Sequence, residues 1–163
     1  MKIGLIVAIK PEADRIALAL GLTQVEVQDY SYCMYTNPDN NIIMLTPGAD
    51  PAFIAYDNQP VCRAGKVSAG IITTILIERY HPDVIINCGT AAGIATNNVH
   101  IGDIVVANAV ANHDIHIPLP GYDAYGIRKI TLKGIELFER ITFPYKQGTV
   151  SSGESFTSGS ILK

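Results

Sequence analysis

Residues 82–93 read PDVIINCGTAAG, and this stretch decides the fold class. Val84 to Asn87 reads as a short buried strand. The residues that follow, Gly89 to Gly93, are small and would form a turn that lets a ligand approach the backbone closely. A buried strand that runs into such a turn predicts an α/β sheet with a candidate ligand site at the carboxyl end of the strand.

Two further runs predict buried strands on either side of this stretch. Lys2 to Ala8 comes before it and Ile104 to Ala111 comes after it. One helix is predicted from Pro11 to about Leu20, because Pro suits a first helical turn. Another is predicted from Lys66 to Tyr80, where apolar residues recur with a helical period. Strands that alternate with helices predict an α/β sheet covered on both sides, in a single domain over residues 1–163.

The remaining segments are predicted to be less regular. An antiparallel hairpin is expected between Val25 and Leu45, with its turn at Asn37 to Asn41. Pro47 to Ala64 is rich in Pro, Asp and Gly, which predicts a long loop of the kind that carries function. After a Pro- and Gly-rich loop at Pro118 to Gly126, a short helix is predicted at Lys133 to Arg140.

Composition narrows the classes of protein and partner. Hydrophobic residues make up 48% of the 163 residues and the mean hydropathy is +0.22, which favours a well-buried sheet or a buried subunit interface. The formal net charge is −3 and no run of Lys and Arg occurs, which disfavours a nucleic-acid partner.

The same sequence disfavours a membrane partner and a disulfide framework. The apolar run Ile3 to Ile9 is too short to span a bilayer and has no convincing cleavage site after it. Cys33, Cys62 and Cys88 are odd in number and form no C-x-x-C pair. A reduced, cytoplasmic location is therefore expected.

Three segments at predicted strand ends carry features that packing alone would not require. Ile9 to Glu12 puts a carboxylate in the first turn of a helix, where it either complements the helix dipole or takes part in chemistry. Gly89 to Gly93 either forms a plain tight turn or admits a ligand. Gly153 to Thr157 contains Phe156, which is either a core residue or a platform for a base.

Several sharper motifs are absent. Gly89 to Gly93 lacks the G-x-G-x-x-G dinucleotide pattern, and Gly65-Lys66 lacks the rest of a P-loop. Gly153 to Thr157 misses the last position of the G-x-S-x-G nucleophile elbow. No metal and no cofactor is expected, because no fourth ligand and no H-E-x-x-H pattern accompany the three nearest candidate ligands, His113, Asp114 and His116.

The short motifs nevertheless occur in a characteristic order. They are Met1 to Ile6 with Ala8 and Glu12, Gly65-Lys66-Val67, residues 82–93, Gly102-Asp103, His113-Asp114 and Ser152 to Phe156. In this order they resemble the 5'-methylthioadenosine/S-adenosylhomocysteine nucleosidases of the nucleoside phosphorylase superfamily. Two stretches, residues 46–51 (TPGADP) and residues 113–126, look like the plant-type branch of that family.

The resemblance implies a three-layer α/β/α nucleoside phosphorylase-like fold with a mixed central sheet. The chain ends at Lys163, where relatives continue with an Asp that acts as an acid and with a Met-Glu pair that binds the ribose. We therefore expect the C-terminal part of the fold to be missing. A homodimer is also expected, because so apolar a domain, cut short, would expose a large hydrophobic patch.

Carried over residue by residue, the resemblance assigns the chemistry to two strand ends. Glu12 would be the catalytic residue and would position and activate the attacking water. Thr90 would lie near the ribose and that water. The backbone of Ala91 and Ala92 would line the pocket.

The resemblance assigns the base and the 5' substituent to other segments. Phe156 would stack on adenine, and Thr157 would offer backbone polar groups to the edge of the base. Ile9 would line the 5'-thioalkyl pocket, and the segment from His113 to Pro118 would help close it. Asn112 stands where many relatives have an aromatic residue, so this pocket would differ from theirs.

The implied reaction is hydrolysis of the N-glycosidic bond of a small nucleoside, in purine and methionine salvage. The substrate would be 5'-methylthioadenosine or S-adenosylhomocysteine, and the products adenine and a 5-thioribose. A purine nucleoside phosphorylase is the alternative, but such enzymes carry Arg in two loops where this chain has residues 8–11 and 85–88, without Arg. A catalytically incomplete nucleoside-binding fragment and a nucleotide-binding Rossmann protein are the remaining readings.

Overall fold

The computed structural model describes residues 1–28, 32–94, 97–126 and 128–154. The chain forms two compact units, Met1–Thr90 and Ala91–Lys163. The single domain expected over residues 1–163 stays a prediction. No helix among the described residues is long and apolar enough to cross a membrane.

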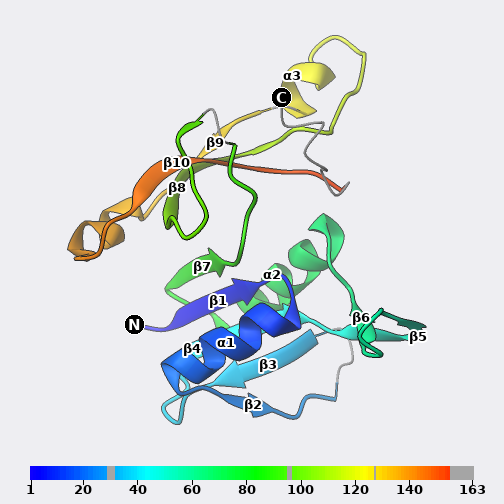
Figure 1. The fold of residues 1–163 in the computed structure, drawn as a ribbon, viewed down its shortest axis with the longest axis vertical. Coiled ribbons are helices and arrows are strands. Elements are labelled where there is room, and N and C mark those ends of the chain that lie inside the picture. Colours follow the sequence, from blue (N-terminus) through cyan, green and yellow to red (C-terminus); the bar gives the residue numbers. More distant parts are fainter. Residues whose placement is uncertain (29–31, 95–96, 127, 155–163) are drawn as a thin grey trace. The chain divides into compact units, whose positions relative to one another are not determined.

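The first unit is built on a mixed five-stranded sheet, in the order β2-β3-β4-β1-β7 (Figure 1). Its strands are β1 (Ile3–Val7), β2 (Thr23–Val25), β3 (Tyr32–Thr36), β4 (Ile42–Pro47) and β7 (Val84–Cys88). β1 pairs in parallel with both β4 and β7, whereas β3 is antiparallel to β2 and β4. The predicted strands and the antiparallel hairpin of this unit are confirmed, but the burial predicted for the strand at Val84 to Asn87 is not, because Ile85 and Asn87 of β7 are exposed.

Two helices cover opposite faces of this sheet, α1 (Lys10–Leu20) in front of it and α2 (Lys66–Tyr80) behind it in Figure 1. α1 has Pro in its first turn and ends at Gly21, whose φ of 63° is the left-handed conformation common at helix ends. Both helices agree with the sequence-based prediction. The unit therefore has the three layers, helix on sheet on helix, that were expected.

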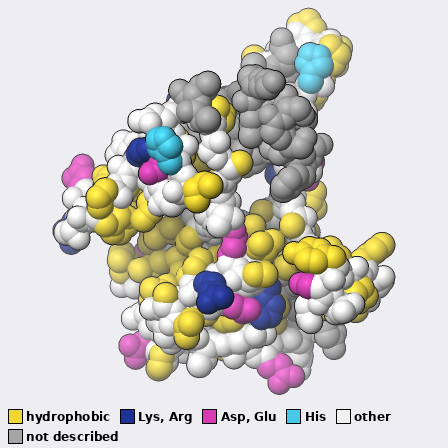
Figure 2. Space-filling model, viewed as in Figure 1, with side chains coloured by type: hydrophobic (Ala, Val, Ile, Leu, Met, Phe, Trp, Pro, Cys, Tyr) yellow, Lys and Arg dark blue, Asp and Glu magenta, His cyan; other side chains and the backbone are white. Residues whose placement is uncertain are grey.

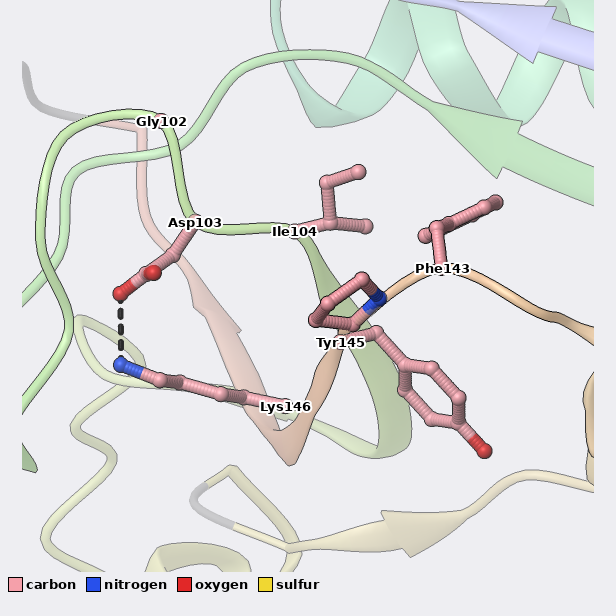
Figure 3. Close-up of a pocket in the computed structure, with 7 residues that line it drawn as sticks. Gly102, Asp103, Ile104, Phe143, Tyr145 and Lys146 are labelled. Atoms are coloured by element: carbon pink, nitrogen blue, oxygen red, sulfur yellow. Dashed lines mark hydrogen bonds and ion pairs between the residues drawn. The ribbon is translucent and has the colours of Figure 1, made fainter.

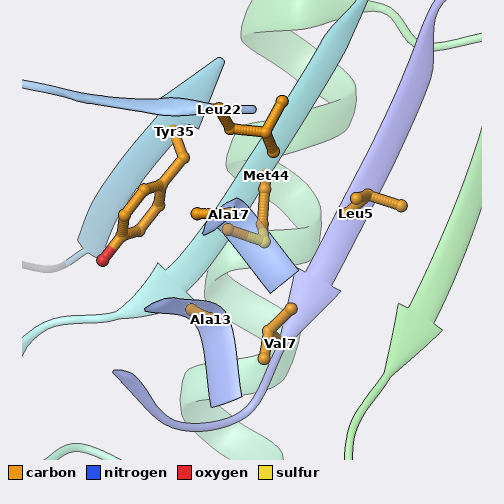
Figure 4. Packing of buried hydrophobic residues seen from close by; sticks show 7 residues of the cluster. All are labelled: Leu5, Val7, Ala13, Ala17, Leu22, Tyr35 and Met44. Atoms are coloured by element: carbon orange, nitrogen blue, oxygen red, sulfur yellow. The ribbon is translucent and has the colours of Figure 1, made fainter. Parts of the chain in front are cut away.

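Alternation along β1 explains how one strand supports both layers, because neighbouring side chains point to opposite faces. Leu5 and Val7 pack with α1 in one cluster, whose members are Leu5, Val7, Ala13, Ala17, Leu22, Tyr35 and Met44 (Figure 4). Ile6 belongs to the other cluster, with Ile72 and Leu76 of α2. Fully burying a side chain such as Leu76 stabilises the fold by about 1.5–3 kcal/mol.

Gly4 lets α2 approach the sheet closely. A Cβ atom at this position would lie 2.7 Å from Cδ2 of Leu76, which is closer than packed atoms tolerate. The absence of a side chain at Gly4 therefore sets the spacing between β1 and α2.

The long loop predicted at Pro47 to Ala64 is wrong for most of its length. The structure has a hairpin there, formed by β5 (Ala49–Ile54) and β6 (Pro60–Cys62). Most residues of both strands are exposed, so the sequence lacks the alternation that marks a half-buried strand. Figure 2 shows hydrophobic side chains gathered over this hairpin; the most exposed of them belong to Phe53, Ile54 and Tyr56.

The second unit has a three-stranded sheet in the order β10-β8-β9. Its strands are β8 (Val105–Asn112), β9 (Ile130–Thr131) and β10 (Lys146–Ser152). β8 is parallel to β10 and antiparallel to β9. The predicted strand at Ile104 to Ala111 is confirmed as β8.

Two short helices complete the second unit. The helix predicted at Lys133 to Arg140 is a 3-10 helix, η2 (Ile135–Arg140). α3 (Tyr122–Gly126) lies inside the segment that was predicted to be only a loop. Five residues make a single helical turn, which is too short for a periodic pattern to reveal.

Candidate active site

Glu12 lies at the carboxyl end of β1, in the first turn of α1. The helix starts directly after the strand, with Ile9 in an extended conformation as the residue that precedes its first turn. Glu12 is half-buried, and so is Ile9. The short connection between β1 and α1 fixes the carboxylate at the edge of the sheet where ligands of α/β proteins bind.

Thr90 meets Glu12 at this edge, although 78 positions separate the two residues. The Thr90 amide donates a hydrogen bond to Oε1 of Glu12 at 2.8 Å, and the Thr90 hydroxyl donates to the same oxygen at 2.5 Å. The contact arises because β1 and β7 are parallel neighbours, with Val7 opposite Cys88, so both strands end together.

The hydrogen-bond partner of the Glu12 carboxylate is a neutral residue. Among the described residues no Lys, Arg or His forms an ion pair with Glu12, and no donor reaches its second oxygen, Oε2. Burial raises the pKa of the Cys88 thiol, and the charge of Glu12 raises it further. A half-buried anion with one oxygen held and one oxygen open is suited to accept a proton or to stabilise positive charge.

His113 lies at the carboxyl end of β8, in the second unit. Its Nδ1 is 2.9 Å from the hydroxyl oxygen of Ser151, and its backbone amide donates to the carbonyl of Ser152 at 3.2 Å. Asp114 accepts a hydrogen bond from the backbone amide of Glu154. Parallel pairing of β8 and β10 therefore fixes the start of the segment that was expected to help close the 5' pocket.

The other predicted site residues are distributed over both units. Ala91 and Ala92 are exposed and begin the second unit, directly after Thr90 in the sequence. Phe156 and Thr157 lie outside the described residues. The structure thus brings Glu12 into contact with Thr90, and the roles assigned to all these residues stay predictions.

Sequence reasoning missed two polar residues, Ser151 and Lys146. The Ser151 hydroxyl lies within hydrogen-bond distance of the His113 ring. Predicting this contact would have required the register of β8 and β10, which sets Ser151 opposite Ala111. Lys146 begins β10 and binds the Asp of the Gly102-Asp103 motif, with 2.7 Å between Nζ and Oδ2. No local pattern announces either contact, because both partners are distant in the sequence.

Asp103 and Lys146 line a pocket of about 390 Å³ at the amino ends of β8 and β10 (Figure 3). Lys146 also donates to the carbonyl of Asn98 at 2.5 Å, and the His100 amide donates to Asp103 at 2.6 Å. The hydrogen bond from Lys146, followed by that from the His100 amide, lowers the pKa of Asp103. The carboxylate of Asp103 and the ammonium group of Lys146 are already paired with protein atoms. We therefore assign this ion pair a structural role in the loop that precedes β8.

Comparison with known proteins supports the family resemblance that the order of the sequence motifs indicates. The family model described as the phosphorylase superfamily matches residues 2–160. The 5'-methylthioadenosine/S-adenosylhomocysteine nucleosidase of Shewanella oneidensis is 33% identical over 124 residues, which are 76% of this chain and 46% of that protein. The enzyme of Shewanella baltica is 34% identical over the same length. The chain spans about half the length of these curated relatives.

Solved structures agree with the fold. The 5'-methylthioadenosine nucleosidase of Arabidopsis thaliana, in apo form, superposes with a TM-score of 0.82 at 27% identity. A second structure, of an MTA/SAH nucleosidase, gives a TM-score of 0.81 at 30% identity. Each match covers 94% of this chain and 63% of the other. The resemblance inferred from the sequence and the mixed α/β fold are confirmed, and the chain belongs to the phosphorylase superfamily.

Proposed function

We propose that the protein hydrolyses the N-glycosidic bond of 5'-methylthioadenosine, with S-adenosylhomocysteine as a second substrate, to adenine and a 5-thioribose. The observation that carries the proposal is the carboxylate of Glu12, which Thr90 holds at the carboxyl edge of the sheet without a neutralising cation among the described residues. The names of the relatives and of the solved structures support the choice of substrate.

In the proposed reaction the bond between the sugar C1' and the adenine nitrogen breaks as a water oxygen bonds to C1'. Positive charge develops on the ribose, and the negative charge of Glu12 stabilises it. The open oxygen, Oε2, accepts a proton from the attacking water, whose hydroxyl group stays on C1', while a nitrogen of the departing adenine takes up a proton from the solvent. Glu12 then returns its proton to the solvent, so that one water molecule is consumed in each cycle. Thr90 keeps Oε1 occupied, so that Oε2 is the oxygen presented to the water.

Four further features belong to the proposal. Ile9 and His113 contact the 5' substituent, Ala91 and Ala92 line the pocket, and Phe156 and Thr157 bind the base.

The protein works in methionine salvage. A reduced cytoplasmic location is supported by Cys33, Cys62 and Cys88, none of which forms a disulfide. A homodimer is supported by the exposed hydrophobic side chains on the β5–β6 hairpin.

The test is the release of adenine from 5'-methylthioadenosine, followed by chromatography with and without phosphate. We expect release at the same rate in both conditions, with a free thioribose as the other product. A rate that depends on phosphate, with a sugar 1-phosphate as product, would replace the proposal with a phosphorylase. Binding of the nucleoside without turnover would replace it with a binding protein.

A further inference from the structure

We infer that Gly89 is a positioning residue for Glu12: the lack of a side chain at this position is what allows the Glu12 carboxylate to bind Thr90 and keep Oε2 open. The inference rests on the proposed function for its kinetic consequence. Its structural part concerns residues of the first unit only, since Glu12, Gly89 and Thr90 all lie within Met1–Thr90.

The geometry around Gly89 is dominated by one side chain. A Cβ atom added at this position would lie 2.9 Å from Oε2 of Glu12, 3.5 Å from its Cδ and 3.6 Å from Oε1, and these are the three nearest atoms. A Cβ contact below 3.0 Å is essentially never found in proteins. The carboxylate of Glu12 therefore packs directly on the backbone of Gly89.

Glu12 cannot simply swing away from a larger residue at this position. Its other oxygen, Oε1, accepts both the amide and the hydroxyl hydrogen bonds of Thr90. Moving the carboxylate would lengthen or break these two bonds, and hydrogen bonds to a charged group are stronger than those between neutral groups. A side chain at position 89 thus competes with the Glu12–Thr90 contact.

The backbone conformation of Gly89 does not by itself call for glycine. Glycine is required on conformational grounds where φ is positive, and the described glycines with positive φ are Gly21, Gly65, Gly102, Gly121 and Gly134. Gly89 is not among them, so an alanine could adopt its backbone angles. What excludes a side chain there is the carboxylate of Glu12.

The oxygen closest to Gly89 is Oε2, which is the one proposed to take the proton from water. A methyl group at position 89 would both push this oxygen and cover part of it. A misplacement of about 1 Å in a reacting group can cost about 100-fold in rate. The glycine therefore controls the position of the base and the access to it.

The kinetic test compares Gly89→Ala with Gly70→Ala. We expect Gly89→Ala to lower kcat for adenine release by about 100-fold while KM changes by less than about threefold, since the base and the 5' substituent are bound by other segments. Gly70 is the matched control, because it is exposed on α2 and a Cβ there meets no atom within 4 Å. Gly70→Ala should leave both constants unchanged. A normal kcat in Gly89→Ala, or a change confined to KM, would overturn the inference.

A thermal double-mutant cycle tests the packing contact without using activity. Gly89→Ala should lower the melting temperature of the protein, by about 2–4 °C for each kcal/mol of strain. In the Glu12→Ala background the same change should raise the melting temperature or leave it unaltered, because the carboxylate is gone and alanine restricts the unfolded chain. An equal decrease in both backgrounds would overturn the inference.

The two tests separate the inference from the proposed function. If the wild-type protein releases no adenine, the proposed function fails, and the cycle still decides whether Gly89 makes room for Glu12. If the wild type is active but the cycle shows no coupling, the inference alone fails. If Gly89→Ala does not fold, the double variant Glu12→Ala with Gly89→Ala should fold, and its failure to do so counts against the inference.

Discussion

Two carboxylates of this chain, one beyond the carboxyl end of a strand and one before the amino end of another, are bound in different ways. Glu12 follows the carboxyl end of β1 and accepts two hydrogen bonds from a neutral residue, Thr90. Asp103 precedes the amino end of β8 and accepts from the ammonium group of Lys146 and from the amide of His100. Both are held firmly, but only Asp103 has its charge neutralised by a cation that contacts it.

The difference separates a structural carboxylate from one suited to chemistry. An anion paired with an ammonium group has little charge left to offer to a substrate, and its pKa is lowered, as that of Asp103 is by Lys146. An anion held through neutral donors, as Glu12 is by Thr90, has no opposite charge in contact with it. Of these two carboxylates, Glu12 is therefore the candidate base, and Asp103 belongs to the framework.

The strongest test of the comparison is Glu12→Gln, which keeps the shape of the side chain and removes its charge. We expect the rate of adenine release to fall by about 10²–10⁴-fold, because loss of a general base costs this much, with substrate binding largely retained. The stability should change by no more than about 1 kcal/mol, the size of a helix-dipole effect. Turnover and melting temperature are measured on the same variant.

The opposite outcome would assign Glu12 to the framework as well. If Glu12 only complements the dipole of α1, the variant keeps a near-normal rate and melts slightly lower. The contrast with Asp103 would then be lost, and with it the chemical basis of the proposed function.

Loss of a hydrogen bond to a third carboxylate, Asp14, is expected to change stability by an intermediate amount. Asp14 accepts from the hydroxyl of Tyr35 at 2.7 Å and from Lys10 at 2.8 Å, and so connects α1 to β3. Tyr35→Phe should lower the free energy of unfolding by about 0.5–1.5 kcal/mol at neutral pH, the value of one hydrogen bond. Adenine release should be unaffected, and chemical denaturation measures the stability change.

Alkaline pH sharpens this prediction. Burial, followed by the hydrogen bond to Asp14, raises the pKa of Tyr35 to about 12, above its ordinary value of 10.0. A group whose pKa rises on folding stabilises the fold below its unfolded pKa, and this contribution is lost as the pH rises through the folded value. The difference between wild type and Tyr35→Phe should therefore shrink between pH 10 and about pH 12. A constant difference over that range would contradict it.

The smallest effect is expected for Asp103→Asn, and it appears as a change in the stability difference from wild type at acid pH. Because Lys146 and the His100 amide lower the pKa of Asp103 from its ordinary value of 3.8, the ion pair stabilises the fold above that value. The contribution is lost as the pH falls below it. Wild type should exceed Asp103→Asn in stability at pH 7, and the two should converge in acid.

Denaturation curves at several pH values check this, with turnover at pH 7 as the control. The rate of adenine release should be the same in Asp103→Asn as in the wild type. A large loss of rate would place Asp103 in the reaction and remove the distinction between the two carboxylates.

The sequence by itself determined the elements whose pattern is local. The apolar runs of β1, β7 and β8 and the period of α2 were sufficient, because burial on one or both faces leaves a record in neighbouring residues. The β5–β6 hairpin left no such record. Its side chains are mostly exposed, and backbone pairing joins its two strands.

The candidate site divides in the same way. Sequence order pointed to Glu12 and Thr90 separately, each at the end of a predicted strand, and it left open whether Glu12 serves the helix dipole or the chemistry. Only the tertiary structure decided that the two residues touch, through the parallel pairing of β1 with β7. It also decided that Gly89 is free of backbone strain and packed against a carboxylate, and that Lys146 neutralises Asp103. Such contacts join residues tens of positions apart, so their energy depends on strand register and helix placement, which no local pattern of residues encodes.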